Sequence, residues 1–186
     1  MNQQELYQSL NYVDHSRDKR TEMAQRVLAD TTLIAPLLDI IKLTKDPLSS
    51  KAAWIMEVIA RKKLNAIVPY LDTFTEVIGT VEQDSTVRPI AKVCELLMER
   101  YFSGKDIYIL QKITEVHLEK ISTACFDWLI GEHKVAAKAY SMTSLFLLGS
   151  KYKWIHPELK SVLEQNYANG SAAYQARARM VLKKLT

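Results

Sequence analysis

The sequence contains little of the two residues that interrupt regular secondary structure. Its 186 residues include only five glycines and five prolines, which argues against a loop-rich or β-rich chain. It also lacks any apolar run near the roughly 18–20 residues that a membrane-spanning helix needs. We therefore expect a helical chain with no membrane partner.

Signals for export and for disulfide formation are also missing. The N-terminal residues 1–5 show no basic segment followed by an apolar core, so they do not resemble a signal peptide. The only two cysteines, Cys94 and Cys125, stand alone, without a Cys-x-x-Cys neighbour. We expect them to be buried, reduced thiols rather than a disulfide or a metal site, and we expect the chain to be cytoplasmic.

Motifs that would identify a reaction are absent. There is no glycine-rich phosphate loop and no Gly-x-Ser-x-Gly, and none of the four histidines stands at a metal-binding spacing from another ligand. His117 and His133 are expected at helix ends on the surface. We therefore predict no catalytic residues, no metal site and no cofactor, and expect that the chain is not an enzyme.

The sequence does contain one repeated motif, the phrase Ile-x-Pro-x-Leu, which occurs three times. It occupies residues 34–38, 67–71 and 155–159, and each copy opens an apolar helical stretch followed by a second helix that carries alanine. Self-similarity at about 20–50 residues is typical of stacked helical hairpins. The phrase predicts an all-α fold, an α-solenoid of stacked antiparallel hairpins with about ten helices.

Each second helix is expected to begin after an acidic or amide residue that caps it. The expected caps are Asp46, Asp84, Glu132 and Asn169. Seven residues after each cap stands an alanine, and these are Ala53, Ala91, Ala139 and Ala176. A small residue in a fixed column lets two helices approach closely. In the fourth unit, two otherwise apolar positions become Arg179 and Lys183, as expected of a terminal repeat.

These features divide the chain into parts of one helical-repeat domain, residues 1–186. Residues 1–30 form an expected N-terminal helix pair, and residues 31–185 form four repeat units. An extra segment at about residues 102–116, with its own short helix, separates the second unit from the third.

The segment Asp84-Ser85-Thr86-Val87-Arg88-Pro89-Ile90-Ala91 resembles the HEAT repeat family, in which a proline-bearing first helix alternates with an Asp-x-x-Val-Arg second helix. The resemblance covers about residues 31–185. It implies a HEAT-like fold and a scaffold or binding platform, because the family's members mostly serve those roles.

The chain also resembles small bacterial HEAT-like proteins that are sometimes labelled adenylosuccinate lyase. The lyase superfamily carries a flexible loop of the form Ser-Ser-x-Met-Pro-x-Lys-x-Asn-Pro. The only Ser-Ser in this chain is Ser49-Ser50, followed by Lys51-Ala52, and the rest of the loop is absent. We therefore expect no adenylosuccinate lyase activity.

One stripe of the second helices, opposite the expected core, mixes aromatic and charged residues. From it we predict a partner-binding set of Trp54, Glu57, Arg61, Arg88, Lys92, Glu95, Tyr140 and Arg177. Stacked second helices line the concave surface of a solenoid, and Trp, Tyr and Arg are over-represented at binding hot spots. The alternative is that Trp54 and Tyr140 pack against neighbouring helices while the charges pair among themselves. Trp128 and Trp154, on first helices, are expected in the core or between repeats.

Two functions are compatible with this stripe. The first is a non-enzymatic module that binds a protein or peptide in the concave groove, with Trp54 as an exposed anchor. The second follows from the resemblance to HEAT-like DNA glycosylases that remove alkylated bases, which hold DNA on a basic face beside aromatic residues and a carboxylate. In this chain, the corresponding residues would be Trp54, Glu57, Arg88 and Lys92. Glu57, Glu95 and Glu99 oppose phosphate binding, so a protein partner is favoured over nucleic acid.

Overall fold

The computed structural model describes residues 1–185, and this range contains only helices and their connections, with no strand. The all-α expectation is confirmed for these residues. They form eleven α-helices, one more than the approximate number expected. The α-helices are α1 (Gln3–Ser9), α2 (Arg17–Ala29), α3 (Ile34–Lys42), α4 (Pro47–Lys63), α5 (Leu71–Val77), α6 (Asp84–Phe102), α7 (Ile107–Lys112), α8 (Glu115–Ile130), α9 (Val135–Leu148), α10 (Ile155–Tyr167) and α11 (Ala172–Leu185).

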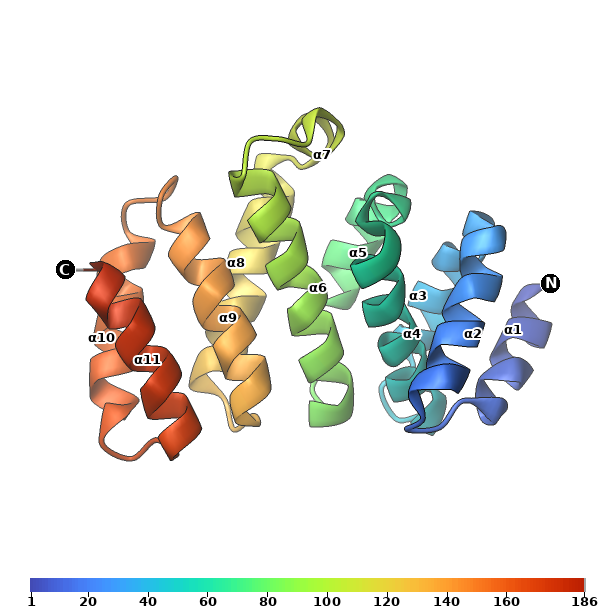
Figure 1. The fold of residues 1–186 in the computed structure, drawn as a ribbon, viewed down its shortest axis with the longest axis horizontal. Helices are drawn as coiled ribbons and strands as arrows, with labels where there is room; N and C mark the ends of the chain where they lie inside the picture. The colour runs from blue at the N-terminus through green and yellow to red at the C-terminus, as the bar shows by residue number, and fades with distance from the viewer. Residues whose placement is uncertain (186) are drawn as a thin grey trace.

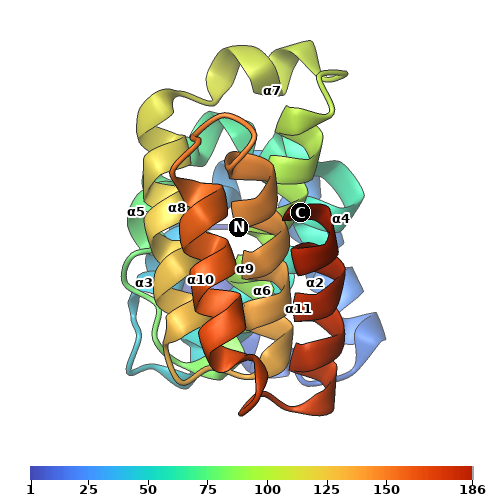
Figure 2. The same cartoon turned by 90° about the vertical axis from the view of Figure 1, so that its left-hand side faces the viewer.

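The helices lie in two layers that run side by side along the long axis of the molecule (Figures 1 and 2). In the second layer α2 packs on α4, α4 on α6, α6 on α9 and α9 on α11. In the first layer α1 packs on α3, α3 on α5 and α5 on α8, while α3–α4, α8–α9 and α10–α11 contacts join the layers. In Figure 2 the ends of the second layer, α2 and α11, lie further to the right than α6 and α9, so this layer is hollowed on that side.

Each Ile-x-Pro-x-Leu phrase stands at the start of a first-layer helix. Pro36 and Pro157 are each the third residue of their helix, α3 and α10, whereas Pro69 lies in the 3-10 turn Val68–Tyr70 just before α5. The flanking apolar residues are all buried: Ile34, Leu38, Ile67, Leu71, Ile155 and Leu159. Proline is tolerated there because a first-turn amide has no intrahelical partner, and the Ile and Leu four residues apart face the core together.

The predicted caps are right for one second-layer helix and wrong for three. Asp46 caps α4, since its carboxylate accepts the Leu48 N–H at 2.8 Å. Glu132 and Asn169 are wrong, because α9 begins only at Val135 and α11 only at Ala172. Asp84 is the first residue of α6 rather than its cap.

Asp84 serves a contact between helices instead. Its Oδ1 lies 2.9 Å from Nδ1 of His133 and accepts the Lys134 N–H at 3.3 Å, which joins the start of α6 to the start of α9. Burial alone would raise the pKa of Asp84, but these two hydrogen bonds lower it below its ordinary value. His133, expected on the surface at a helix end, is half-buried in this contact. His117 does stand at the start of α8, but the expectation of a surface position is wrong, because it is buried with Nε2 2.7 Å from Asp72.

The later helix starts shift the small-residue column as well. Ala53 and Ala91 are buried as expected, but Ala139 is half-buried and Ala176 is exposed. Ala53 is the seventh residue of α4, and the seventh residues of α9 and α11 are Ser141 and Ala178, both fully buried. Small buried residues therefore occur on α9 and α11 two residues further along than predicted, whereas the seventh residue of α6 is Ile90 and Ala91 is the eighth. Arg179 and Lys183 are exposed on α11, the last helix.

Candidate functional site

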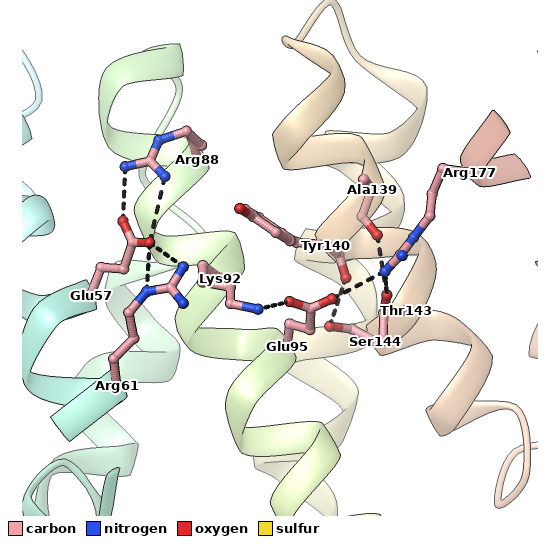
Figure 3. A network of polar contacts seen from close by, with 10 residues as sticks. All are labelled: Glu57, Arg61, Arg88, Lys92, Glu95, Ala139, Tyr140, Thr143, Ser144 and Arg177. Atoms are coloured by element: carbon pink, nitrogen blue, oxygen red, sulfur yellow. Dashed lines mark hydrogen bonds and ion pairs between the residues drawn. The ribbon is translucent and has the colours of Figure 1, made fainter. Parts of the chain in front are cut away.

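The predicted binding residues lie together in one row across the second layer. Figure 3 shows all of them except Trp54, on α4, α6, α9 and α11, where hydrogen bonds and ion pairs form two clusters. Each cluster is centred on a glutamate, Glu57 on α4 and Glu95 on α6. These glutamates are the most buried members of the row, at 6% and 3% exposure.

The first cluster holds the Glu57 carboxylate between two guanidinium groups. Arg61, one helical turn along α4, donates to Oε1 from Nε at 3.1 Å and from Nη2 at 2.8 Å. Arg88 reaches from α6 and donates to Oε2 from Nη2 at 2.8 Å, with a longer contact of 3.5 Å from Nη1 to Oε1. Both carboxylate oxygens are therefore occupied, and the cluster carries a surplus of one positive charge.

The second cluster repeats this arrangement with different cations. Lys92, on α6 itself, donates from Nζ to Oε2 of Glu95, and Arg177 comes from α11 with Nη2 3.4 Å from Oε1. The same Arg177 nitrogen also donates to Thr143 on α9. Lys92 lies over the ring of Tyr140, with Nζ 4.9 Å from the ring centroid, so three neighbouring helices are tied at this point.

The structure therefore places all eight predicted residues on helices of the second layer, and it shows that the two glutamates are buried. We expected Glu57 and Glu95 on the stripe opposite the core, but both are buried, and their charges pair within the row, as the alternative interpretation held. Arg61 and Lys92 reach their glutamates along the same helix, whereas Arg88 and Arg177 reach them from other helices of the layer. A buried carboxylate is tolerated only when its charge is matched nearby, and here each has two cations.

Trp54 is half-buried rather than the exposed anchor that the sequence suggested. Its Nε1–H donates to the Ser85 carbonyl at 3.0 Å, and its ring lies 4.8 Å from that of His15. Pro89 stands four residues after Ser85 inside α6 and has no N–H to donate. The tryptophan thus supplies the hydrogen bond that the proline removes, and it joins α4 to α6.

This pairing makes a testable prediction. Trp54→Phe keeps an aromatic ring but removes the donor, so the free energy of unfolding should fall by about 1 kcal/mol in chemical denaturation. In a Pro89→Ala background, residue 89 regains an N–H for the Ser85 carbonyl, and the same substitution should cost less. Equal costs in the two backgrounds would show that the tryptophan and the proline are not coupled.

A cleft of about 420 Å³ lies beside the first cluster, between α2, α4 and α6. Its charged lining is Arg17, Arg20, Arg61, Lys62, Arg88 and Glu57. The one carboxylate is already paired, and Arg17 and Lys62 form no ion pair with any residue from 1 to 185. The cleft therefore presents positive charge to solvent and suits an anionic group.

Sequence reasoning missed the contribution of α2 to this cleft. Arg17 and Arg20 were outside every repeat column, since the N-terminal helix pair was not aligned with the four units. A signal was available, because residues three apart share one face of a helix. Lys62 directly follows the predicted Arg61, and its position beside Arg17 depends on how α2 packs on α4.

The two cysteines are not reactive groups. Both are fully buried and free. Burial raises the pKa of the Cys125 thiol to about 12, although hydrogen bonding with Ser144 and Ser141 acts in the opposite direction. Burial and the neighbouring Cys125 raise the pKa of Cys94 well above its ordinary value. At neutral pH neither forms the thiolate that nucleophilic attack or metal binding requires.

Within residues 1–185, no group of three or more His, Cys, Asp or Glu side chains is placed to hold a metal ion. None of the helices in this range combines the length and the apolar character needed to cross a bilayer. Comparison with protein-family models, with curated proteins and with solved structures gives no match to this chain.

Proposed function

We propose that this chain is a non-enzymatic, cytoplasmic interaction module, built as a HEAT-like α-solenoid, whose second-layer face binds an acidic segment of a partner protein. The solenoid interpretation is supported by the recurrence of Ile-x-Pro-x-Leu at the starts of α3, α5 and α10. It is also supported by the two layers, in which each second-layer helix packs on the next. A hollowed layer of this kind gives an extended partner several helices to contact at once.

The observation that carries the proposal is the basic cleft between α2, α4 and α6. Five basic side chains line it, and its single carboxylate, Glu57, is already bound by two of them. Because Glu57 holds Arg61 and Arg88 in place, part of the entropy cost of ordering these long side chains is met before a partner binds. Guanidinium groups fixed in this way favour carboxylates, which they bind with paired hydrogen bonds.

An acidic protein segment fits the charge distribution better than a nucleic acid backbone. In the cleft, Arg17 and Lys62 have no carboxylate partner among residues 1–185, whereas Lys92 and Arg177 further along the row are engaged with Glu95. A duplex would require cations spaced along the whole face to neutralise successive phosphates. A short acidic stretch requires only the cleft.

One observation does favour the alternative, a HEAT-like nucleic-acid-binding protein. The carboxylates that seemed to oppose phosphates, Glu57 and Glu95, are buried and covered by cations, so they no longer repel a polyanion. This observation does not extend to glycosylase chemistry. Glu57 is saturated by hydrogen bonds from two guanidinium groups and has no free oxygen facing a base.

The two functions can be separated by fluorescence anisotropy with a labelled poly-glutamate peptide and with labelled duplex DNA. We expect the peptide to bind more tightly, and the Arg17→Glu/Lys62→Glu double variant to weaken peptide binding by at least about tenfold, since it reverses two charges at the cleft. The matched control, Lys112→Glu/Lys153→Glu, reverses two exposed lysines elsewhere and should leave binding unchanged.

The outcomes differ clearly. Tighter binding of DNA, lost in the same double variant, would support the nucleic-acid alternative. If both charge-reversed proteins bind the peptide equally, the attraction comes from overall charge, and the cleft is not a site.

A further inference from the structure

A second cleft lies on the other layer, between α8 and the connection from α9 to α10, away from the charged row. It encloses about 520 Å³, within the range of small-molecule sites. Its lining consists of Glu119, Ser122, Thr123, Phe126, Asp127, Tyr152 and Trp154. These are aromatic rings, hydroxyl groups and carboxylates, with no basic side chain among them.

The cleft contains a buried hydroxyl group without a partner. Ser122 is 4% exposed, and its Oγ forms no hydrogen bond with any residue from 1 to 185. Other helical hydroxyls in this chain bond to the carbonyl four residues earlier, as Thr123 does to Glu119 and Ser141 to Ala137. A buried polar group left unpaired costs free energy, so this hydroxyl points to a ligand that can hydrogen-bond to it.

The aromatic side chains that line the cleft, here called the aromatic wall, are Phe126, Tyr152 and Trp154. Trp154 was expected in the core or between repeats; 59% of it is exposed, and it stacks on Phe126 of α8 with ring centroids 5.8 Å apart. Tyr152 is held in position by a hydrogen bond from its hydroxyl to Glu115. Burial first, and then this hydrogen bond, raises the Tyr152 pKa, so its ring stays neutral. An indole face is the best aromatic surface for a cation.

The two carboxylates of the cleft are uncommitted. Glu119 and Asp127 lie eight residues apart on α8, both are exposed, and neither forms an ion pair within the described part of the chain. Two lysines flank these aromatic residues in sequence: Lys151 is 2.6 Å from Glu115, and Lys153 is exposed and is not part of the lining. The cleft thus offers negative charge and an aromatic surface to a cation, with no competing lysine in its lining.

We propose that this cleft binds a primary alkylammonium group of the lysine type. The carboxylates and Trp154 select a positive charge, and the Ser122 hydroxyl selects a cation that carries N–H groups. A quaternary ammonium would satisfy the first requirement but could not hydrogen-bond to Ser122. The alkyl chain would lie along Phe126 and Trp154. This site is independent of the acidic-segment function proposed for the other face.

Isothermal titration of the whole protein with n-butylammonium, choline and 1-butanol tests the proposal. Butylammonium should bind most tightly, choline more weakly, and neutral 1-butanol at least about tenfold more weakly than butylammonium. Trp154→Ala should weaken butylammonium binding by at least about tenfold, and because Trp154 is exposed, the melting temperature should change little. Asp127→Asn should weaken binding, whereas the control Glu158→Gln, an exposed carboxylate on α10 outside the cleft, should not.

The Ser122→Ala variant provides the sharpest readout, because it should remove the preference for butylammonium over choline without abolishing binding of either. Cadaverine and Nα-acetyl-lysine methylamide then distinguish a free diamine from a protein side chain as the source of the ammonium group. No binding of butylammonium, equal binding of 1-butanol, or binding unaffected by Trp154→Ala would overturn the proposal.

Discussion

Replacing Glu95 with alanine should lower the free energy of unfolding by about 3 kcal/mol or more. Glu95 is the most buried charged group in the row, and among residues 1–185 its carboxylate is the only one in contact with Lys92 and Arg177. Removing one member of a buried ion pair costs roughly 3–5 kcal/mol, because the remaining charge has lost its compensation. Here two cations would lose it together. The Nε atom of Arg177 is already buried without a hydrogen-bond partner, so few other groups could pair with this side chain once Glu95 is removed.

Urea or guanidinium denaturation checks this prediction, with Glu99→Ala as the matched control. Glu99 lies one turn further along α6 and is exposed, so its loss should change stability by less than about 0.5 kcal/mol. Combining Glu95→Ala with Lys92→Met should cost less than the sum of the two single changes, since each leaves the other partner unpaired. Equal effects at positions 95 and 99 would show that the cluster does not stabilise the fold.

The helical layout of the first layer could be predicted because its signal is local. Ile34 and Ile155 each begin a helix in the structure, as the repeated phrase indicated. Apolar residues four apart and a proline in the first turn act within one helical turn, so no distant contact has to be known. The phrase was less informative at residues 67–71, where a 3-10 turn precedes a short α5.

The registers of α9 and α11 could not be predicted in the same way. Any acidic or amide residue near a helix start is a possible cap, and the choice depends on which donors come within reach. Asp84 is used by His133 and Lys134, which are distant in sequence. Glu132 and Asn169 were predicted as caps from the sequence alone, so the starts of α9 and α11 were placed too early. The small-residue positions predicted from them, Ala139 and Ala176, are therefore two residues too early as well.

The candidate site, too, could be predicted only in part from the sequence. Spacing placed its residues on one face, because an angular position on a helix follows from sequence number. Spacing did not reveal how far each residue is buried, because that depends on side chains from the neighbouring helix. Arg88 covers Glu57 and Arg177 covers Glu95 only because α4, α6 and α11 are arranged in one layer. The bond between Trp54 and Ser85 likewise requires α4 and α6 to be adjacent.

The end of α9 depends on a glycine for a reason that sequence alone does not give. Gly149 follows the last residue of α9, and the imidazole of His156 lies directly against it. His156 stacks on Phe146 with ring centroids 5.5 Å apart, and its Nε2 lies 2.8 Å from the Phe146 carbonyl oxygen. A carbonyl can only accept, so Nε2 carries the proton and donates. This bond satisfies a carbonyl in the last turn of α9.

Gly149→Ala should therefore destabilise the protein by about 2–3 kcal/mol. An added Cβ would stand 1.8 Å from Cδ2 of His156 and 2.3 Å from its Nε2, so the ring must leave and the bond to Phe146 must break. Gly79→Ala is the matched control, because its Cβ would meet only the Glu76 carbonyl at 3.7 Å. That change should be neutral or slightly stabilising, since alanine restricts the unfolded chain.

The partner variant His156→Ala identifies the cause of the loss. By itself it should cost roughly 1 kcal/mol or more, because the Phe146 carbonyl loses its donor and the stacked ring is gone. Once it is present, adding Gly149→Ala should cost almost nothing, since the Cβ no longer meets a ring. Melting or denaturation curves of the four proteins measure this directly. If the loss of stability in the double variant equals the sum of the two single losses, Gly149 is required for its backbone conformation. The close approach of His156 would then not contribute to the cost of Gly149→Ala.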